Sequence, residues 1–193
     1  MEIRSVVSPF QGVRIGLDAE ALSGPEWFPA HQTRLAICFG FGTADNVGYV
    51  QAKDMTAGVF DEEDLMAVAY AVAQPGVIVV AHNANYDLDL LNGTLLDHGL
   101  DPLPSVQYQD TMNTLKTGRA FRRTLKDRCA ALGVNLKGGS PNWRDILQRK
   151  PAAWSLMRDY NINDVICTLQ LERAYAAREQ YVPIKTWHPR RPK

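Results

Sequence analysis

A short apolar segment that ends in two carboxylates constrains this chain most. The segment is IGLDAE, residues 15–20. If it forms a strand, alternate side chains point to opposite faces, so Asp18 and Glu20 stand side by side, facing away from Leu17. Like charges at the end of a central strand repel each other and are costly to desolvate unless protons or a cation neutralise them. The pair therefore indicates a site for a hard divalent metal, although acidic pairs also occur on exposed edge strands.

The composition is that of an ordinary globular protein. The chain has 193 residues, of which 46% are hydrophobic and 22% are charged, enough to bury one core. Lys plus Arg and Asp plus Glu both number 21, so no overall basic field attracts a polyanion and any nucleic-acid contact must be local. We expect a single domain over residues 1–182 and a basic, flexible tail over residues 183–193.

The cysteines and the N-terminus bear on the compartment. Cys38, Cys129 and Cys167 are odd in number, widely spaced and without C-x-x-C spacing, which argues against a disulfide framework and a zinc site. The N-terminal residues lack the apolar core of a signal peptide, and no apolar run is long enough to cross a bilayer. We therefore expect a cytoplasmic protein that makes no membrane contact.

Apolar periodicity and turn residues predict the elements in the order β-β-β-α-β-α-β-α-α, which is an α/β fold with a mixed five-stranded sheet flanked by helices. Strands are predicted at residues 15–19, 33–41, 46–51, 76–81 and 105–111, and helices at 61–73, 86–98, 125–132 and 152–181, the last as one or two helices. In such sheets ligands bind at the carboxyl ends of the strands.

Polar residues follow the buried strand predicted at residues 76–81. The sequence HNANYD places His82 and Asn83 at the carboxyl end of this strand and Asp87 in the first turn of the next helix. Asp87 can then face Asp18 across the sheet. The alternative is that Asp87 only complements the helix macrodipole.

A tyrosine and an aspartate share one face of the last predicted helix. In YNIND, Tyr160 and Asp164 are four residues apart, so the hydroxyl lies beside the carboxylate. We expect Ile162, Ile166 and Leu169 to form the apolar stripe that anchors this helix to the core. For Tyr160 by itself, core packing is the alternative.

The motifs GLDAEA, HNANYD and YNIND, in this order, resemble the three exonuclease motifs of the DEDD superfamily, the DnaQ-like 3′ to 5′ exonucleases with a ribonuclease-H-like fold. Y-x-x-x-D resembles the tyrosine subgroup. The chain is similar to the proofreading domains of bacteriophage family-A DNA polymerases, which have a pair like Asp110 and Thr111. The resemblance spans residues 15–171 and implies a nuclease of the cytoplasm, or of the host cytoplasm if the chain is of phage origin.

The resemblance also implies the roles of the site residues. Two Mg²⁺ or Mn²⁺ ions about 4 Å apart would stabilise the attacking and leaving oxygens of a phosphodiester. Asp18 would bridge both ions, Glu20 and Asp164 would complete the first, and Asp87 would hold the second, partly through water. Tyr160 would orient the attacking water, since an unperturbed pKa near ~10 makes it a poor base. The products would be nucleoside 5′-monophosphates from a single-stranded DNA 3′ end.

Further residues are predicted to contact substrate. Ala21 replaces the threonine of many relatives, which leaves only its backbone for the terminal nucleotide. Leu22 is a candidate wedge under the last base, with burial in the core as the alternative. His82 would support the site without acting as a base, and Asn83 would either touch substrate or hold its loop.

The densest internal basic cluster surrounds Phe121. Its members are Lys116, Arg119, Arg122, Arg123 and Lys126. They could guide a phosphate backbone to the acidic site, with help from Arg190, Arg191 and Lys193 in the tail. The alternative is a solvated charged face.

Three functions are compatible with these residues. The first is a 3′ to 5′ exonuclease on single-stranded DNA, freestanding or paired with a separately encoded DNA polymerase, since no polymerase domain follows Lys193. The second is a 3′ to 5′ exoribonuclease, which would differ in how it treats the 2′-hydroxyl. The third is a catalytically silent nucleic-acid-binding module, which the presence of all four acids and Tyr160 disfavours.

Overall fold

The structure, a computed structural model, describes residues 12–23, 34–54, 57–113, 124–134, 139, 141–178 and 182–189. The strands are β1 Arg14–Ser23, β2 Arg34–Thr43, β3 Asn46–Gln51, β4 Ile78–Ala81, β5 Val106–Asp110 and β6 Ile184–Trp187. The helices are α1 Glu62–Ala73, α2 Ala84–Asp97, α3 Leu125–Leu132, α4 Trp143–Leu147 and α5 Pro151–Ala176, with a 3-10 helix η1 at Thr111–Asn113.

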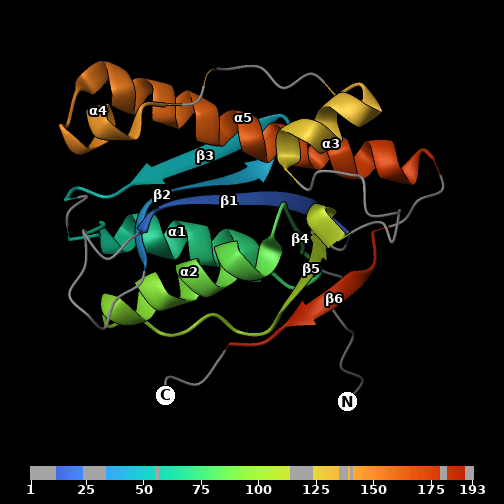
Figure 1. Cartoon of the computed structure of the whole chain (residues 1–193). Coiled ribbons are helices and arrows are strands. Elements are labelled where there is room, and N and C mark those ends of the chain that lie inside the picture. Colours follow the sequence, from blue (N-terminus) through green and yellow to red (C-terminus); the bar gives the residue numbers. More distant parts are fainter. Residues whose placement is uncertain are drawn as a thin grey trace, which may run out of the picture.

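The strands form one mixed sheet in the order β3-β2-β1-β4-β5-β6. The first three strands pair antiparallel, whereas β1, β4 and β5 run parallel to one another. Helices α1 and α2 cover one face, and α3, α4 and α5 cover the other (Figure 1). The predicted α/β class, a mixed sheet flanked by helices, is confirmed.

The sequence predicts five strands and a flexible tail from residue 183. Both expectations are wrong at Ile184–Trp187, which form the sixth strand, β6. This strand pairs antiparallel with β5, and its last residue, Trp187, is buried and donates its indole N–H to Asp89 Oδ1 at 3.0 Å. The other three side chains of β6 are exposed. A four-residue strand of this kind has no alternating pattern to reveal it. Residues 190–193 lie outside the described part of the chain.

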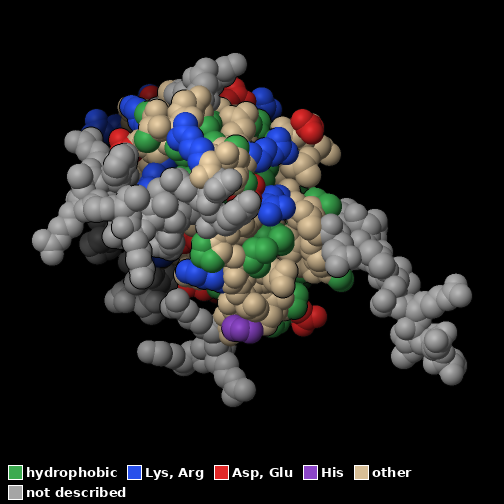
Figure 2. All heavy atoms as spheres, turned by 90° about the vertical axis from the view of Figure 1, so that its right-hand side faces the viewer, with side chains coloured by type: hydrophobic (Ala, Val, Ile, Leu, Met, Phe, Trp, Pro, Cys, Tyr) green, Lys and Arg blue, Asp and Glu red, His purple; other side chains and the backbone are tan. Residues whose placement is uncertain are grey.

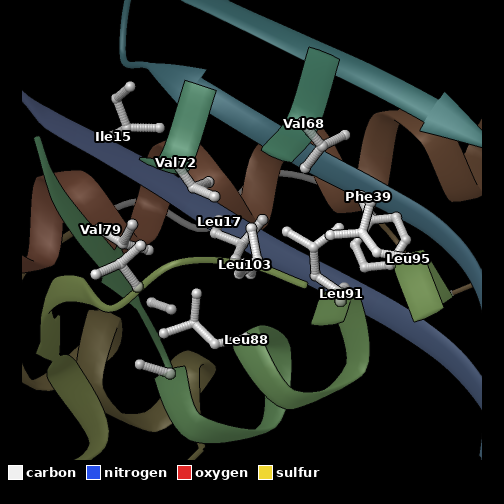
Figure 3. Packing of buried hydrophobic residues seen from close by; sticks show 14 of the residues in the cluster. Ile15, Leu17, Phe39, Val68, Val72, Val79, Leu88, Leu91, Leu95 and Leu103 are labelled. Atoms are coloured by element: carbon white, nitrogen blue, oxygen red, sulfur yellow. The ribbon is translucent and has the colours of Figure 1, made fainter. Parts of the chain in front are cut away.

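The main core lies between the sheet and the helices α1 and α2. Leu17 on β1 is fully buried, and it packs with Val79 on β4 and with Leu88 and Leu91 on α2 (Figure 3). Leu17 therefore faces α2, on the side of β1 opposite to Asp18, and this opposition is the predicted one. The neighbouring Asp18 is on the opposite face of β1, which α5 covers.

Helix α5 crosses the other face of the sheet over two glycines. A Cβ atom built on Gly16 of β1 would lie 2.7 Å from Val165 Cγ1, and one built on Gly40 of β2 would lie 2.3 Å from Asn161 Oδ1. Such distances are too short for real contacts, so glycine at these positions lets α5 lie close to the strands. None of the described helices is both long enough and apolar enough to span a membrane.

The face of α5 that meets the sheet differs from the predicted one. Asn161 and Val165 are fully buried, whereas Ile162 and Ile166 are only half-buried. The expected anchoring stripe is therefore wrong except at Leu169, which is buried. The buried face includes polar residues. The face predicted from apolar periodicity alone is therefore shifted by about one residue from the observed one.

We expect Gly16→Ala to lower the free energy of unfolding by about 1–3 kcal/mol, because the added methyl group would press on Val165 and force α5 away from the sheet. The measurement is urea unfolding. The control is Gly93→Ala in α2, where a Cβ would meet nothing within 4 Å and which should gain about 0.5–1 kcal/mol through lower backbone entropy in the unfolded chain. Equal effects of the two substitutions would contradict this account of α5 packing.

Candidate active site

Strand β1 brings the first two predicted acids beside the carboxyl end of β4. Gly16 pairs with Val80 in parallel register, so Asp18, two residues on, lies beside the end of β4. Asp18 pairs with Gly40 of β2, and Glu20 pairs with Cys38. The β1–β2 register shifts directly after Glu20. Such bulges bend a strand and re-aim its side chains, and here the pairing resumes in the shifted register at Ala21, which pairs with Ala36.

A carboxylate from α5 completes an acidic triad, which we define as Asp18, Glu20 and Asp164. One oxygen from each side chain lies within 4.8 Å of one from each of the others. Asp164 is 7% exposed, and its Oδ1 atom is buried without a hydrogen-bond partner. The structure therefore brings together Glu20 and Asp164, which are 144 residues apart in the sequence.

Asp87 lies beside the triad, in the first turn of α2. Its Oδ1 atom accepts a hydrogen bond from the backbone N–H of Ala19 at 3.1 Å, which ties α2 to the strand between the two acids of β1. Asp87 is 3% exposed, and its charge is the largest charge effect on the pKa of Asp18. The predicted position of Asp87, facing Asp18, agrees with this geometry.

Burial raises the pKa values of all four acids, and repulsion from neighbouring carboxylates adds to it for Asp18, Glu20 and Asp87. For Asp18 burial is the main cause, and the charges of its three acidic neighbours add to it, while a hydrogen bond from Asn161 lowers the pKa. Burial and the charge of Asp164 raise the pKa of Glu20 to about 7. Burial raises the pKa of Asp164 to about 6 despite a hydrogen bond from Tyr160. Burial likewise raises the pKa of Asp87.

Tyr160 is half-buried one turn before Asp164 and packs against the core beside Leu22 and Met157. Its hydroxyl hydrogen-bonds the Asp164 carboxylate, and burial together with that negative charge raises its pKa above the usual value. The phenol therefore stays protonated near neutral pH. It can donate a hydrogen bond, and it is unsuited to act as a base.

The donor set suits a hard divalent cation. Carboxylate oxygens are the ligands that Mg²⁺, Mn²⁺ and Ca²⁺ prefer, and an ion among them would offset both the cost of burying these charges and their mutual repulsion. Among the described residues, none of the four acids forms a salt bridge. The acidic triad could therefore hold a metal ion.

The loop after β4 is held by residues at the end of β5. Asn83 has a left-handed backbone, with φ 93° and ψ 49°, a conformation that asparagine tolerates better than most residues. Its backbone N–H donates to Asp110 Oδ1 at 3.1 Å, and the same oxygen accepts the N–H of Met112 at 2.9 Å. Of the two predicted roles, the structure assigns Asn83 at least the holding of this loop.

His82 belongs to the same support. Its Nδ1 atom lies 2.9 Å from Thr111 Oγ1, and that hydroxyl donates to the carbonyl of Ala81 at 3.2 Å. The contact agrees with the predicted supporting role. A direct contact of His82 with substrate stays a prediction.

The remaining residues predicted to contact substrate differ in their burial, and two of them are not described. Leu22 is 6% exposed and packs with Ile37 and Met157, which supports the alternative of burial in the core; the wedge role stays a prediction. Ala21 is half-buried directly after the acids. Arg122 and Arg123 lie outside the described residues.

Lys126 is the second residue of α3, and it is exposed. Of the predicted basic cluster, it is the one member within the described part of the chain. Figure 2 shows Lys and Arg side chains scattered over the side of the molecule at the right of Figure 1. In this view the basic side chains are interspersed with hydrophobic and acidic ones. Guidance of a phosphate backbone by the basic cluster stays a prediction.

One residue of the site was not predicted. Asn161 is fully buried, and its Nδ2 atom donates to Asp18 Oδ2 at 2.6 Å and to the Asp18 carbonyl at 3.2 Å. A polar residue between Tyr160 and Asp164, on the same helix, was the available signal. Spacing alone could not show which face of α5 meets the sheet.

Comparisons with known proteins match the fold. The family B DNA polymerase from the hyperthermophilic archaeon Pyrobaculum calidifontis superposes with a TM-score of 0.65 and 16% sequence identity, over 84% of this chain and 24% of the polymerase chain. The chain therefore spans about a quarter of that protein. A structure described as the apo form of a nuclease superposes with a TM-score of 0.55 and 18% identity, over 88% of this chain and 73% of that one.

At these identities the likeness concerns the fold alone, and it is consistent with the predicted ribonuclease-H-like fold. No family model and no curated protein matches the chain.

In chelator, we expect the melting temperature to fall by several degrees between about pH 5 and pH 8. Glu20 and Asp164 have folded-state pKa values of about 7 and about 6, above their ordinary values of 4.5 and 3.8. Their neutral forms stabilise the folded state at low pH, and this contribution is lost as the pH rises through 6 and 7. Millimolar Mg²⁺ or Mn²⁺ should remove much of the fall, because a cation replaces the protons.

Differential scanning calorimetry checks this expectation. Glu20→Gln should make the melting temperature in chelator depend less on pH. Glu63→Gln, which changes an exposed acid of α1, should leave the pH dependence of the melting temperature unchanged. A melting temperature that is constant or rises over this pH range in chelator would show that the folded state does not raise the pKa values of these acids.

Proposed function

We propose that this chain is a metal-dependent 3′ to 5′ exonuclease that releases nucleoside 5′-monophosphates from single-stranded DNA ends. The observation that carries the proposal is the acidic triad, with oxygens of all three side chains within 4.8 Å of one another beside the carboxyl end of β4. Its supports are the three motifs that resemble the tyrosine subgroup of the DEDD superfamily and the likeness in fold to a DNA polymerase and a nuclease.

The reaction is hydrolysis of the terminal phosphodiester. A water oxygen forms a bond to phosphorus, the bond from phosphorus to the 3′ oxygen breaks, and a proton passes to that oxygen. Two Mg²⁺ or Mn²⁺ ions, when bound, would stabilise the charge on the attacking and leaving oxygens and ease deprotonation of the water. We assign the first ion to Asp18, Glu20 and Asp164, and the second to Asp18 and Asp87.

The other groups of the chain orient these parts. The Tyr160 hydroxyl, kept protonated by burial and by Asp164, would donate or accept a hydrogen bond that directs the attacking water. The backbone N–H of Ala19 holds Asp87 in place. The loop of His82 and Asn83, fixed from the end of β5, lies where the terminal nucleotide would enter.

The partner that we propose is a single-stranded DNA 3′ end. Association with a separately encoded DNA polymerase stays a prediction from the motif resemblance. The exoribonuclease and the silent binding module are outcomes of the following test.

We expect Asp18→Ala to lower the cleavage rate on the order of 10³-fold or more, because loss of a bridging ligand removes several kcal/mol of transition-state stabilisation. Tyr160→Phe should lower it by about 10- to 100-fold, the cost of one hydrogen bond to the reacting water. The control is Asp159→Asn, which changes an exposed acid next to Tyr160 and should leave the rate unchanged.

The measurement is a time course on DNA and RNA strands of the same sequence, labelled at the 5′ end and separately at the 3′ end, in Mg²⁺, Mn²⁺ or chelator. Attack from the 3′ end shortens the 5′-labelled strand stepwise and releases the 3′ label at once as a mononucleotide. Faster loss of the RNA strand would indicate the exoribonuclease, and binding without cleavage the silent module. Wild-type activity in Asp18→Ala would overturn the assignment of the site.

A further inference from the structure

A buried asparagine makes two hydrogen bonds to a single residue of the site. The Asn161 Nδ2 atom donates to Asp18 Oδ2 at 2.6 Å and to the backbone carbonyl of Asp18 at 3.2 Å. Both donor hydrogens of one amide are thus used on the side chain and the main chain of the same aspartate. Such a pair of bonds fixes the rotation of the carboxylate relative to β1.

The orientation of this amide follows from its surroundings. If its nitrogen and oxygen were exchanged, the oxygen would face two acceptor atoms of Asp18. In the observed orientation Asn161 Oδ1 is buried without a hydrogen-bond partner, which costs stability. The amide therefore satisfies Asp18 and leaves its own oxygen without a hydrogen bond. Packing by itself would favour an apolar side chain at this position.

The sheet leaves space for this amide. Asn161 is fully buried, and its Oδ1 atom lies over Gly40, the residue of β2 that pairs with Asp18. A Cβ on Gly40 would come within 2.3 Å of that oxygen. Asn161 thus occupies a gap between α5 and β2 that exists only because residue 40 is glycine.

A neutral donor has a specific advantage at this position. The Asp18 carboxylate lies near three other carboxylates, which would turn it away from them if its rotation were free. A lysine or arginine would hold it but would supply a positive charge that competes with a cation. An amide orients the carboxylate without neutralising it.

We propose that Asn161 is a positioning residue that holds the Asp18 carboxylate in the orientation required to bind divalent metal. The inference deepens the proposed function and rests on it, since it concerns the same site. Groups that orient metal ligands in this way typically contribute 10- to 100-fold to metal affinity.

The test measures Mn²⁺ binding to the full chain by isothermal titration calorimetry, without nucleic acid. Asn161→Leu removes the donor and the unpaired oxygen while keeping the same number and branching of side-chain heavy atoms, and we expect Mn²⁺ to bind at least tenfold more weakly. Asn163→Ala, which changes a half-buried asparagine on the same helix, should bind Mn²⁺ as the wild type does. Circular dichroism verifies that each variant is folded.

Two further variants separate positioning from a structural role. In an Asp18→Ala background, Asn161→Leu should cause no additional loss of Mn²⁺ affinity, because the group that it positions is absent. Gly40→Ala should also weaken Mn²⁺ binding, since the added methyl would displace the amide. If Asn161→Leu does not fold, Asn161→Ala replaces it in both backgrounds.

Cleavage assays distinguish this inference from the proposed function. The cleavage rate of Asn161→Leu should approach the wild-type rate as the Mn²⁺ concentration is raised, because the lost affinity is recovered by mass action. Unchanged Mn²⁺ affinity in both Asn161 variants, or equal losses with and without Asp18, would overturn the positioning role. A wild-type protein that binds Mn²⁺ but cleaves neither DNA nor RNA would overturn the proposed function and leave the metal-binding result to stand by itself.

Discussion

The close packing of α5 on the sheet is the constraint on which the site depends. Gly16 and Gly40 present no side chain to the helix, so Val165 and Asn161 lie almost against the strands. This proximity carries Asp164, on the same face of α5, to the acids of β1. The resulting repulsion is built into the fold, because the packing that buries the apolar side chains of α5 also brings its carboxylate to the others.

The protein orients its acids with neutral groups. The Ala19 N–H holds Asp87, the Asn161 amide holds Asp18, and the Tyr160 hydroxyl bonds Asp164. No salt bridge reaches the four acids among the described residues. Neutral donors fix geometry but leave the negative charge in place, so the attraction for an external cation is retained. A site neutralised internally by Lys or Arg would be more stable without metal and would bind it more weakly.

Local patterns predicted most of the elements, because a strand or helix with one buried face shows it in its own residues. The hairpin of β2 and β3, the buried strand β4 and the helix α3 all carry such patterns. The short elements β6 and α4 were not predicted, since four or five residues do not establish a period. The anchoring stripe of α5 was assigned to Ile162 and Ile166 because the true face holds Asn161 and Asp164, whose burial serves the site rather than the core.

Local sequence patterns are sufficient to show which groups act together within one element. Alternation along a strand puts Asp18 and Glu20 on one face, and a four-residue spacing on a helix puts Tyr160 beside Asp164. The burial of Leu22 and the contact of Asn161 with Asp18, 143 residues away in the sequence, depend instead on how the elements pack. The physical reason is that periodicity sets a side chain's direction relative to its own backbone. Its neighbours depend on which elements pack together and how closely, and here glycines on two strands set that distance.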